Sequence, residues 1–361
     1  MRIVLDARKY FDFGIGTYIQ NLVQHLRSRC SLGLIVSSED ISKIERDPTV
    51  ELQVNSSGKY SIQELFSVSR DVHRMKADLF HSPHYTVPFN LKVPLVTTIH
   101  DILHVKGKTY YSYPKRIYAE AMIAHACRIS EAVIVDSEFT KKELLSEFNI
   151  SGDRVHVIYL GVADDFSRAS GEGERKAFRN KYALNKPFIL YTGSLKPHKN
   201  VPTLIKAYSQ LAHRKNYQLV FSGETLSEHK SLVEIIKANN VSEGVVDIGR
   251  ISRKELAIAY KEASVVVLPS HYEGFGFSIL EAMASGTPTI GARAASIPEV
   301  IGNAGILFDP FSAEELAQEL EKVLTNDNLR TSLIQRGYEQ VKRFTWEACA
   351  SKTFQIYRDL L

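Results

Sequence analysis

The chain has 361 residues, of which 44% are hydrophobic and 24% are charged. This length exceeds the usual size of a single hydrophobic core, so we expect two domains of ordinary globular composition. The formal net charge of +4 is too small to indicate a nucleic-acid-binding protein, although it suits a phosphate-bearing ligand or an anionic membrane surface.

The cysteines and the apolar runs indicate the cellular compartment in which the protein is expected. Cys30, Cys127 and Cys349 are odd in number and widely scattered, so neither a disulfide framework nor a zinc site is predicted. No run approaches the ~18 apolar residues of a membrane span, and the run after Met1 is too short for a signal peptide. We therefore expect a cytoplasmic protein whose membrane contact, if any, is peripheral and at the inner membrane surface.

Short apolar runs alternate with helical patterns in both halves of the chain. This alternation predicts an α/β protein with two doubly wound, Rossmann-like domains whose parallel sheets face a central cleft. In the first half, strands are expected at residues 2–6, 33–36, 78–81, 94–99, 132–135 and 155–158. In the second half they are expected at residues 188–192, 217–222, 245–248, 264–268, 288–291 and 305–307. A polar, glycine-bearing stretch at residues 164–174 is the predicted linker.

A pair of glycines near the start of the chain raises one alternative function. Gly14 and Gly16 precede an amphipathic helix, as in a dinucleotide-binding fold, and Glu39 and Asp40 follow the second strand. The third glycine of that fingerprint is replaced by Ile19, and the loop before Gly14 is longer than the tight turn that the fingerprint requires. These two differences count against a dinucleotide site, but Glu39 and Asp40 after the second strand keep an NAD-dependent oxidoreductase as an alternative.

Two regions of the first half carry candidate functional side chains. His100 and Asp101 end a strand, where His100 could bond either a ligand or nearby backbone, whereas His81 and His84 are interpreted as loop scaffolding. Residues 106–116 contain no acid, and such a basic, aromatic segment could face anionic lipid or form a solvated surface. Its basic and aromatic members are Lys106, Lys108, Lys115, Arg116, Tyr110, Tyr111 and Tyr113.

The second half contains the most informative stretch of the chain. It follows the buried strand at 264–268 and reads Glu273-Gly274-Phe275-Gly276-Phe277-Ser278-Ile279-Leu280-Glu281. The two glycines allow close backbone approach, and a helix from about residue 277 to residue 285, closed by Gly286, would direct its N-terminus at the loop. This layout predicts a diphosphate site without a metal, with Glu281 at a ribose and Glu273 beyond the phosphates. Lys199, in a turn after the strand at 188–192, could add charge to the phosphates or be a solvated lysine.

Five motifs along the chain resemble those of the retaining glycosyltransferases of family 4, which have the GT-B architecture. They are Gly14-Ile15-Gly16, Thr97-Thr98-Ile99-His100-Asp101, Tyr191-Thr192-Gly193-Ser194-Leu195-Lys196-Pro197-His198-Lys199-Asn200, the stretch from Glu273 to Glu281, and Phe344-Thr345-Trp346. The resemblance implies an acceptor-side domain at residues 1–164, completed by a C-terminal helix at 345–361 that crosses back to it. It also implies a domain at residues 174–344 that binds the nucleotide sugar.

The resemblance also implies roles for particular residues. The implied catalytic residues are Glu273, His100 and Lys199. The implied substrate-binding residues are Gly14, Gly16, Asp101, Ser194, Arg250, Gly274, Phe275, Gly276, Phe277, Ser278 and Glu281. Ser194 stands where the family often has an arginine, and Lys196, His198 or Arg250 could compensate. No metal or other cofactor is implied.

The expected activity is the metal-independent transfer of a hexose, with retention, from a nucleotide sugar to a glycan or lipid-linked acceptor. The turn around Lys199 and the stretch Ser296-Ile297-Pro298-Glu299-Val300 are most similar to members that transfer mannose. GDP-mannose is therefore the favoured donor, and a UDP-sugar is the other candidate. A sugar-nucleotide epimerase or a phosphorylase of similar architecture remains a further alternative.

Overall fold

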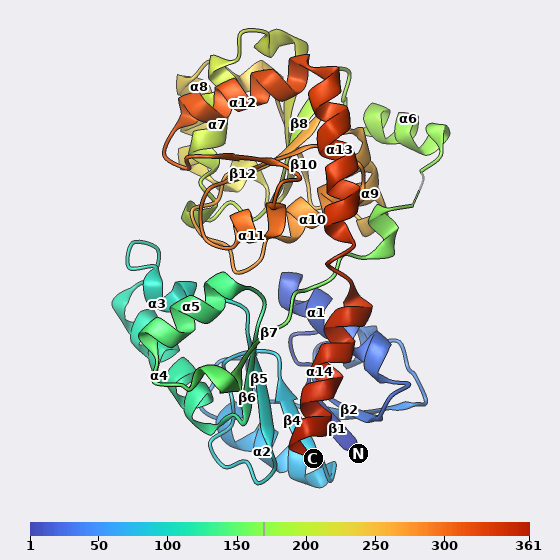
Figure 1. The fold of residues 1–361 in the computed structure, drawn as a ribbon, viewed down its shortest axis with the longest axis vertical. Helices are drawn as coiled ribbons and strands as arrows, with labels where there is room; N and C mark the ends of the chain where they lie inside the picture. The colour runs from blue at the N-terminus through green and yellow to red at the C-terminus, as the bar shows by residue number, and fades with distance from the viewer. Residues whose placement is uncertain (169) are drawn as a thin grey trace. The chain divides into compact units, whose positions relative to one another are not determined.

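The computed structural model describes residues 1–168 and 170–361, which divide into two compact units. Unit 1 comprises Met1–Gly161 and Trp346–Leu361, and unit 2 comprises Val162–Thr345. In each unit, helices cover a parallel sheet (Figure 1), so the predicted α/β class with two doubly wound sheets is confirmed. Ala169, in the predicted linker, lies outside the described residues.

Unit 1 is built on a seven-stranded sheet in the order β3-β2-β1-β4-β5-β6-β7. Its strands are β1 (Arg2–Asp6), β2 (Ser31–Ser37), β3 (Val50–Asn55), β4 (Leu79–Ser82), β5 (Leu95–Ile99), β6 (Ala132–Val135) and β7 (Val155–Val157). The six strands predicted for this half are confirmed. Strand β3 was missed because it lies at the sheet edge, where exposed residues interrupt the apolar run that marks a strand buried on both faces.

The last helix of the chain belongs to unit 1. The helices of this unit are α1 (Phe13–Leu26), α2 (Glu64–Arg74), α3 (Leu103–Lys106), α4 (Tyr113–Ile129), α5 (Glu138–Glu147) and α14 (Trp346–Leu360). Figure 1 shows α14 in red beside the sheet, and its side chains bond to this unit. Arg29 Nη1 donates to Ser351 Oγ at 2.8 Å, and Tyr357 Oη lies 2.5 Å from His81 Nδ1.

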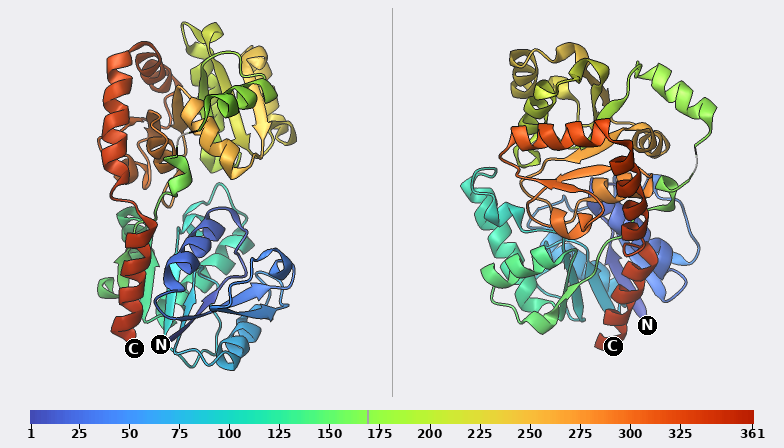
Figure 2. Two further views of the ribbon diagram at one scale, coloured as in Figure 1. Left: turned by 90° about the vertical axis from the view of Figure 1, so that its right-hand side faces the viewer. Right: turned by 45° about the horizontal axis from the view of Figure 1, so that its top comes forward.

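Unit 2 is built on a six-stranded sheet in the order β10-β9-β8-β11-β12-β13. Its strands, all predicted, are β8 (Phe188–Gly193), β9 (Gln218–Gly223), β10 (Val245–Gly249), β11 (Val265–Leu268), β12 (Thr289–Ala292) and β13 (Ile306–Phe308). Figure 2 shows the helices around this sheet from two further directions. They are α6 (Glu172–Lys181), α7 (Val201–Gln210), α8 (Lys230–Ala238), α9 (Arg253–Glu262), α10 (Phe277–Ala284), α11 (Ile297–Ile301), α12 (Ala313–Thr325) and α13 (Asp327–Val341).

Each sheet has a point at which the strand order reverses. In unit 1 the first strand, β1, lies between β2 and β4, so the reversal falls between β1 and β4. In unit 2 the first strand, β8, lies between β9 and β11, so the reversal falls between β8 and β11. Ligands of open α/β sheets bind at the carboxyl ends of the strands at such a point. The loops that follow β8 and β11 are therefore the first place to look for a site in unit 2.

The predicted linker lies largely within unit 2. Asp164–Phe166 form a short 3-10 turn, and the ring of Phe166 is buried 5.6 Å from that of Tyr260. The chain passes between the units at Gly161 and Val162, three residues before the predicted end of the first domain. The polar composition of residues 164–174 concealed this single buried aromatic anchor.

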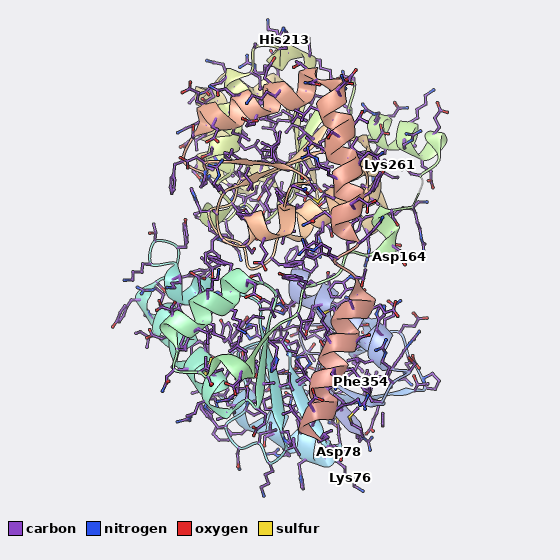
Figure 3. All side chains as sticks on the ribbon, in the orientation of Figure 1. Lys76, Asp78, Asp164, His213, Lys261 and Phe354 are labelled. Carbon is purple, nitrogen blue, oxygen red and sulfur yellow. The ribbon has the colours of Figure 1, made fainter. Side chains whose placement is uncertain are left out.

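Side chains fill the space between sheet and helices in both units (Figure 3). At the amino ends of the unit 1 strands, Asp78 accepts a hydrogen bond of 2.7 Å from the backbone of Arg2. Within residues 1–168 and 170–361, no helix combines the length and the apolar character needed to cross a membrane.

Candidate active site

Two loops at the strand-order reversal of unit 2 are tied to each other. The loop after β8 contains the 3-10 turn Pro197–Lys199, and the loop after β11 leads to Glu273. The backbone N–H of His271 donates to His198 O at 2.8 Å, and Asn200 Nδ2 donates to Pro269 O at 3.0 Å. These bonds fix the two loops against each other, which is needed if both are to contact one ligand.

The ammonium of Lys199 and the carboxylate of Glu273 form an ion pair between these loops. Lys199 Nζ lies 2.7 Å from one carboxylate oxygen and 2.9 Å from the other, and Ser270 Oγ donates to the first at 2.6 Å. The side chains are only 20% and 13% exposed, so the alternative of a solvated lysine is wrong. An ammonium has three N–H donors. Because one carboxylate occupies two of them, Lys199 can offer the third to a phosphate oxygen.

The loop between Glu273 and α10 is held from beneath by Ser296. This buried hydroxyl lies 2.8 Å from Glu273 O and 3.0 Å from Phe275 O, so its single proton is shared between the two carbonyl oxygens. The Phe275 ring is buried against those of Phe277 and Phe344. This interior contact supplements the substrate-binding role that the family resemblance implies for Phe275. Sequence reasoning noted Ser296 only as part of a motif, although a small polar residue after β12 could have pointed to such support.

Helix α10 begins directly after this loop. Gly276 precedes it with φ of +106°, a backbone conformation that favours glycine. The helix runs over Phe277–Ala284 and is closed by Gly286 at φ +75°, which confirms the predicted element. The positive end of its dipole, at Phe277 and Ser278, therefore follows Glu273 by four residues, across the loop that Ser296 bonds. A helix N-terminus beside a lysine is a suitable site for a diphosphate.

Glu281 lies one turn into α10 and is positioned by a tyrosine that sequence reasoning missed. Tyr260 Oη, fully buried on α9, donates to Glu281 Oε2 at 2.7 Å and lies 2.7 Å from Thr192 Oγ1. Burial raises the pKa of Glu281, and the Tyr260 hydrogen bond opposes that rise. The spacing between residues 260 and 281 carries no signal of this contact, because the two residues belong to different helices.

Removing the Tyr260 hydroxyl tests this positioning. We expect Tyr260→Phe to weaken nucleoside diphosphate binding about fivefold, or ~1 kcal/mol, because Glu281 loses one neutral hydrogen bond. The substitution also raises the pKa of Glu281 further. Binding that needs the ionised carboxylate is retained at high pH and lost as the pH falls, so the variant should lose it at a higher pH than the parent.

Titration calorimetry at several pH values measures both effects. Tyr208→Phe is the matched control, since Tyr208 is similarly buried and its hydroxyl lies 2.8 Å from the backbone carbonyl of Tyr217, not near a carboxylate among the described residues. A pH dependence of binding that is the same for both variants would show that Tyr260 only stabilises the fold.

In unit 1, the candidate residue His100 is bonded to Asp136 and not to Asp101, the helper that the sequence suggested. His100 Nδ1 lies 2.6 Å from Oδ2 of the buried Asp136, which follows the neighbouring strand β6. Burial alone would lower the pKa of His100, but the charge and hydrogen bond of Asp136 outweigh burial and raise it. Asp101, expected as the helper, instead accepts from the backbone N–H of Leu103 at 2.9 Å, at the start of α3. Asp136 could have been found from its place directly after a predicted strand.

Two predictions about loops of unit 1 are wrong. Gly14 and Gly16 do not precede the helix but lie in the first turn of α1, which begins at Phe13. A Cβ on Gly16 would lie 2.5 Å from Tyr10 O, so this glycine is required by a close backbone contact. His81 lies within strand β4, where Tyr357 and Thr98 occupy its two ring nitrogens and burial lowers its pKa to about 3.

Ser194 stands where the family often has an arginine, and which residue takes over the role of that arginine stays a prediction. The carbonyl of Ser194 accepts from Tyr191 Oη at 2.5 Å. Among the three candidates, Lys196 is exposed and His198 is buried in the turn next to Lys199. Arg250 is exposed after β10, the edge strand two positions from β8.

The basic and aromatic segment at residues 106–116 is partly engaged within unit 1. Lys106 forms an ion pair with Glu147, and the Tyr111 ring lies 4.4 Å from that of His104. Lys108, Tyr113 and other members remain exposed. Contact of this segment with lipid stays a prediction.

Solved structures with the same fold cover the whole chain. Sucrose-phosphate synthase from Thermosynechococcus elongatus has a TM-score of 0.81 at 22% identity and matches 100% of this chain and 99% of that chain. The Anabaena protein HepE, solved in complex with UDP and glucose, has a TM-score of 0.81 at 19% identity and matches 100% of both chains. The fold is GT-B.

Family models match both units. Residues 14–166 match the model "Glycosyltransferase Family 4", and residues 174–340 match "Glycosyl transferases group 1". The O-antigen chain mannosyltransferase B of Escherichia coli is 28% identical over 381 residues, covering 99% of this chain and 100% of that protein. The chain belongs to glycosyltransferase family 4 and is similar to its mannosyltransferase members, and neither finding favours the oxidoreductase alternative.

Proposed function

We propose that the protein transfers mannose from GDP-mannose to a glycan or lipid-linked acceptor, with retention of the anomeric configuration and without a metal ion. The observation that carries this proposal is the Lys199–Glu273 pair beside the N-terminus of α10, at the strand-order reversal of unit 2. The choice of mannose rests on the mannosyltransferase relative from Escherichia coli. A UDP-sugar is the second candidate donor, because HepE binds UDP and glucose.

In this proposal the residues of unit 2 divide the donor among them. The diphosphate lies at the N-terminus of α10, where the helix dipole and the third N–H of Lys199 stabilise the charge that develops on the leaving group. Glu281 bonds the ribose, and Glu273 holds hydroxyls of the transferred sugar. The substrate-binding roles of Gly274, Phe275 and Gly276 are backbone contacts of this same loop.

The bond changes follow front-face substitution. The bond between the anomeric carbon and the phosphate oxygen breaks, and the acceptor oxygen forms its bond to the same face of that carbon. The acceptor proton passes to the departing phosphate oxygen, so the products are the glycoside and a nucleoside diphosphate. The catalytic role proposed for His100 rests on the family resemblance, and its Nδ1 is bonded to Asp136.

Transfer assays with and without chelator test the proposal. We expect release of GDP from GDP-mannose in excess EDTA, at a rate close to that without EDTA, because Lys199 and the helix supply the charge that a metal would otherwise supply. UDP-glucose under the same conditions is the competing donor, and NMR of the product gives the anomeric configuration. Activity that disappears with EDTA and returns with Mg²⁺ would contradict metal independence, and an inverted product would contradict retention.

A further inference from the structure

Phe311 is an unusually exposed aromatic residue in unit 2. Its side chain is 83% exposed, and it follows Pro310 in the loop after β13. The ring is stacked on that of His271, with ring centroids 4.9 Å apart and planes inclined by 28°. A Phe ring stacked on an imidazole and 83% exposed presents a flat apolar face to solvent.

The stacked pair lies beside the proposed site for the transferred sugar. His271 is two residues before Glu273, and its backbone N–H bonds the turn that contains Lys199. Asn200, directly after Lys199, donates through Nδ2 to Pro310 O at 2.8 Å as well as to Pro269 O. Three loops therefore meet here. His271, on which Phe311 stacks, precedes Glu273 by two residues, whereas Glu281 bonds to α9 through Tyr260.

The chemistry of the pair suits a sugar ring. A pyranose has one face of C–H groups, which packs on an aromatic ring, and hydroxyls at its rim, which need hydrogen-bond partners. Burial lowers the pKa of His271 and so favours its neutral imidazole, which has one donor and one acceptor nitrogen. Its Nδ1 is buried and has no hydrogen-bond partner within residues 1–168 and 170–361.

The surrounding charges disfavour a membrane as the occupant. Asp309 accepts from the backbone of Phe311 at 3.0 Å, and Glu315 accepts from the backbone of Asp309 at 2.8 Å. Glu314 follows on the first turn of α12. Arg293 lies 3.5 Å from Glu315 and offsets its charge, which leaves the carboxylates of Asp309 and Glu314 near Phe311. An anionic lipid surface would be repelled by these two carboxylates, whereas a neutral glycan would not.

We propose that Phe311 and His271 form a binding subsite for a sugar ring of the acceptor glycan. The ring of Phe311 packs on the C–H face of that sugar, and the His271 imidazole bonds one of its hydroxyls. The inference rests on the proposed function for its assignment to the acceptor. It places part of the acceptor specificity in unit 2, on two loops that are also bonded to the Lys199–Glu273 pair.

Phe311→Ala tests the subsite, because so exposed a side chain can be removed without loss of core packing. With GDP-mannose as donor and a synthetic mannose trisaccharide as acceptor, we expect acceptor KM to rise about tenfold, the effect of losing one stacked contact. The rate of GDP-mannose hydrolysis without acceptor and the affinity for GDP should stay within about twofold of the parent. The melting temperature should stay within about 1 °C, as for a neutral surface substitution. Phe311→Tyr should restore the parent KM.

Phe66→Ala is the matched control, since Phe66 is also exposed and packs on another ring, that of Phe89 in unit 1. It should leave acceptor KM unchanged. An equal fall in hydrolysis and transfer for Phe311→Ala would assign the ring to the donor sugar and overturn the inference. So would an unchanged acceptor KM, or binding to phosphatidylglycerol vesicles that is lost in the variant.

A measurement without turnover separates this inference from the proposed function. Saturation-transfer NMR with the mannose trisaccharide should show transfer from aromatic protons of the parent, reduced in Phe311→Ala and in His271→Ala. If no sugar nucleotide is turned over, the proposed function fails, and the NMR signal still reports on the subsite. If the signal is the same in parent and variants, the subsite is wrong even where transfer is observed.

Discussion

Replacing Glu273 with glutamine is expected to lower kcat by about 10² to 10³, the range found when one preorganised electrostatic contact to a transition state is removed. The substitution keeps the shape of the side chain and removes its charge. Positive charge builds at the anomeric carbon only as the bond to the leaving group breaks, so the loss should appear in kcat rather than in KM. Steady-state kinetics with varied donor measures the two separately.

The matched control for this prediction is Glu228→Gln, which neutralises an exposed glutamate after β9. It should leave both constants unchanged. Calorimetry adds a second criterion, because the bare nucleoside diphosphate lacks the sugar that Glu273 contacts. If Glu273→Gln and Glu281→Ala weakened binding of the bare diphosphate equally, the division of roles between the two glutamates would be wrong.

Replacing Lys199 with alanine is expected to lower kcat/KM for the donor. The fall should correspond to a loss of about 2–3 kcal/mol in transition-state stabilisation, the value of a hydrogen bond to a charged group. The loss has two sources. The phosphates lose a charge-assisted contact, and Glu273 is left as a partly buried carboxylate with Ser270 as its remaining described partner. Kinetics with Glu273→Gln, Lys199→Ala and the double variant should therefore be strongly non-additive.

The matched control is Lys206→Ala, which removes an exposed lysine from α7, the helix that follows the same turn. Its kinetics should stay within about twofold of the parent, as for other exposed substitutions. Equal kinetics for the Lys206 and Lys199 variants would show that the ammonium of Lys199 contributes nothing to donor use.

The sequence predicted features that depend on neighbours along the chain. Buried strands of a parallel sheet are continuous apolar runs, so twelve strands could be located, and the edge strand β3 could not. The helix closed by Gly286 was predictable because a glycine with positive φ ends a helix in a recognisable way. The turn at Lys199 and the loop at Glu273 were placed at one edge of a sheet for the same reason.

Contacts between distant segments were harder to predict. The pairs Lys199–Glu273 and His100–Asp136 join loops that are 74 and 36 residues apart in the sequence. The local sequence of one loop does not identify the residue with which it pairs. Sequence proximity favoured Asp101 as the helper of His100, whereas the sheet order brings the end of β6 next to the end of β5. Side-chain pairing follows strand order, which local sequence does not encode.

The return of α14 to unit 1 affects the order in which the chain can fold during synthesis. Unit 1 is discontinuous, because all of unit 2 is inserted between Gly161 and Trp346. A ribosome therefore completes unit 2 before it makes the helix whose Tyr357 bonds the buried ring of His81. Until then, the first 161 residues lack the helix that packs against them, and His81 lacks one of its two hydrogen-bond partners. The nascent protein must carry this unfinished surface while the second unit is translated, which makes unit 1 the part most dependent on protection from aggregation.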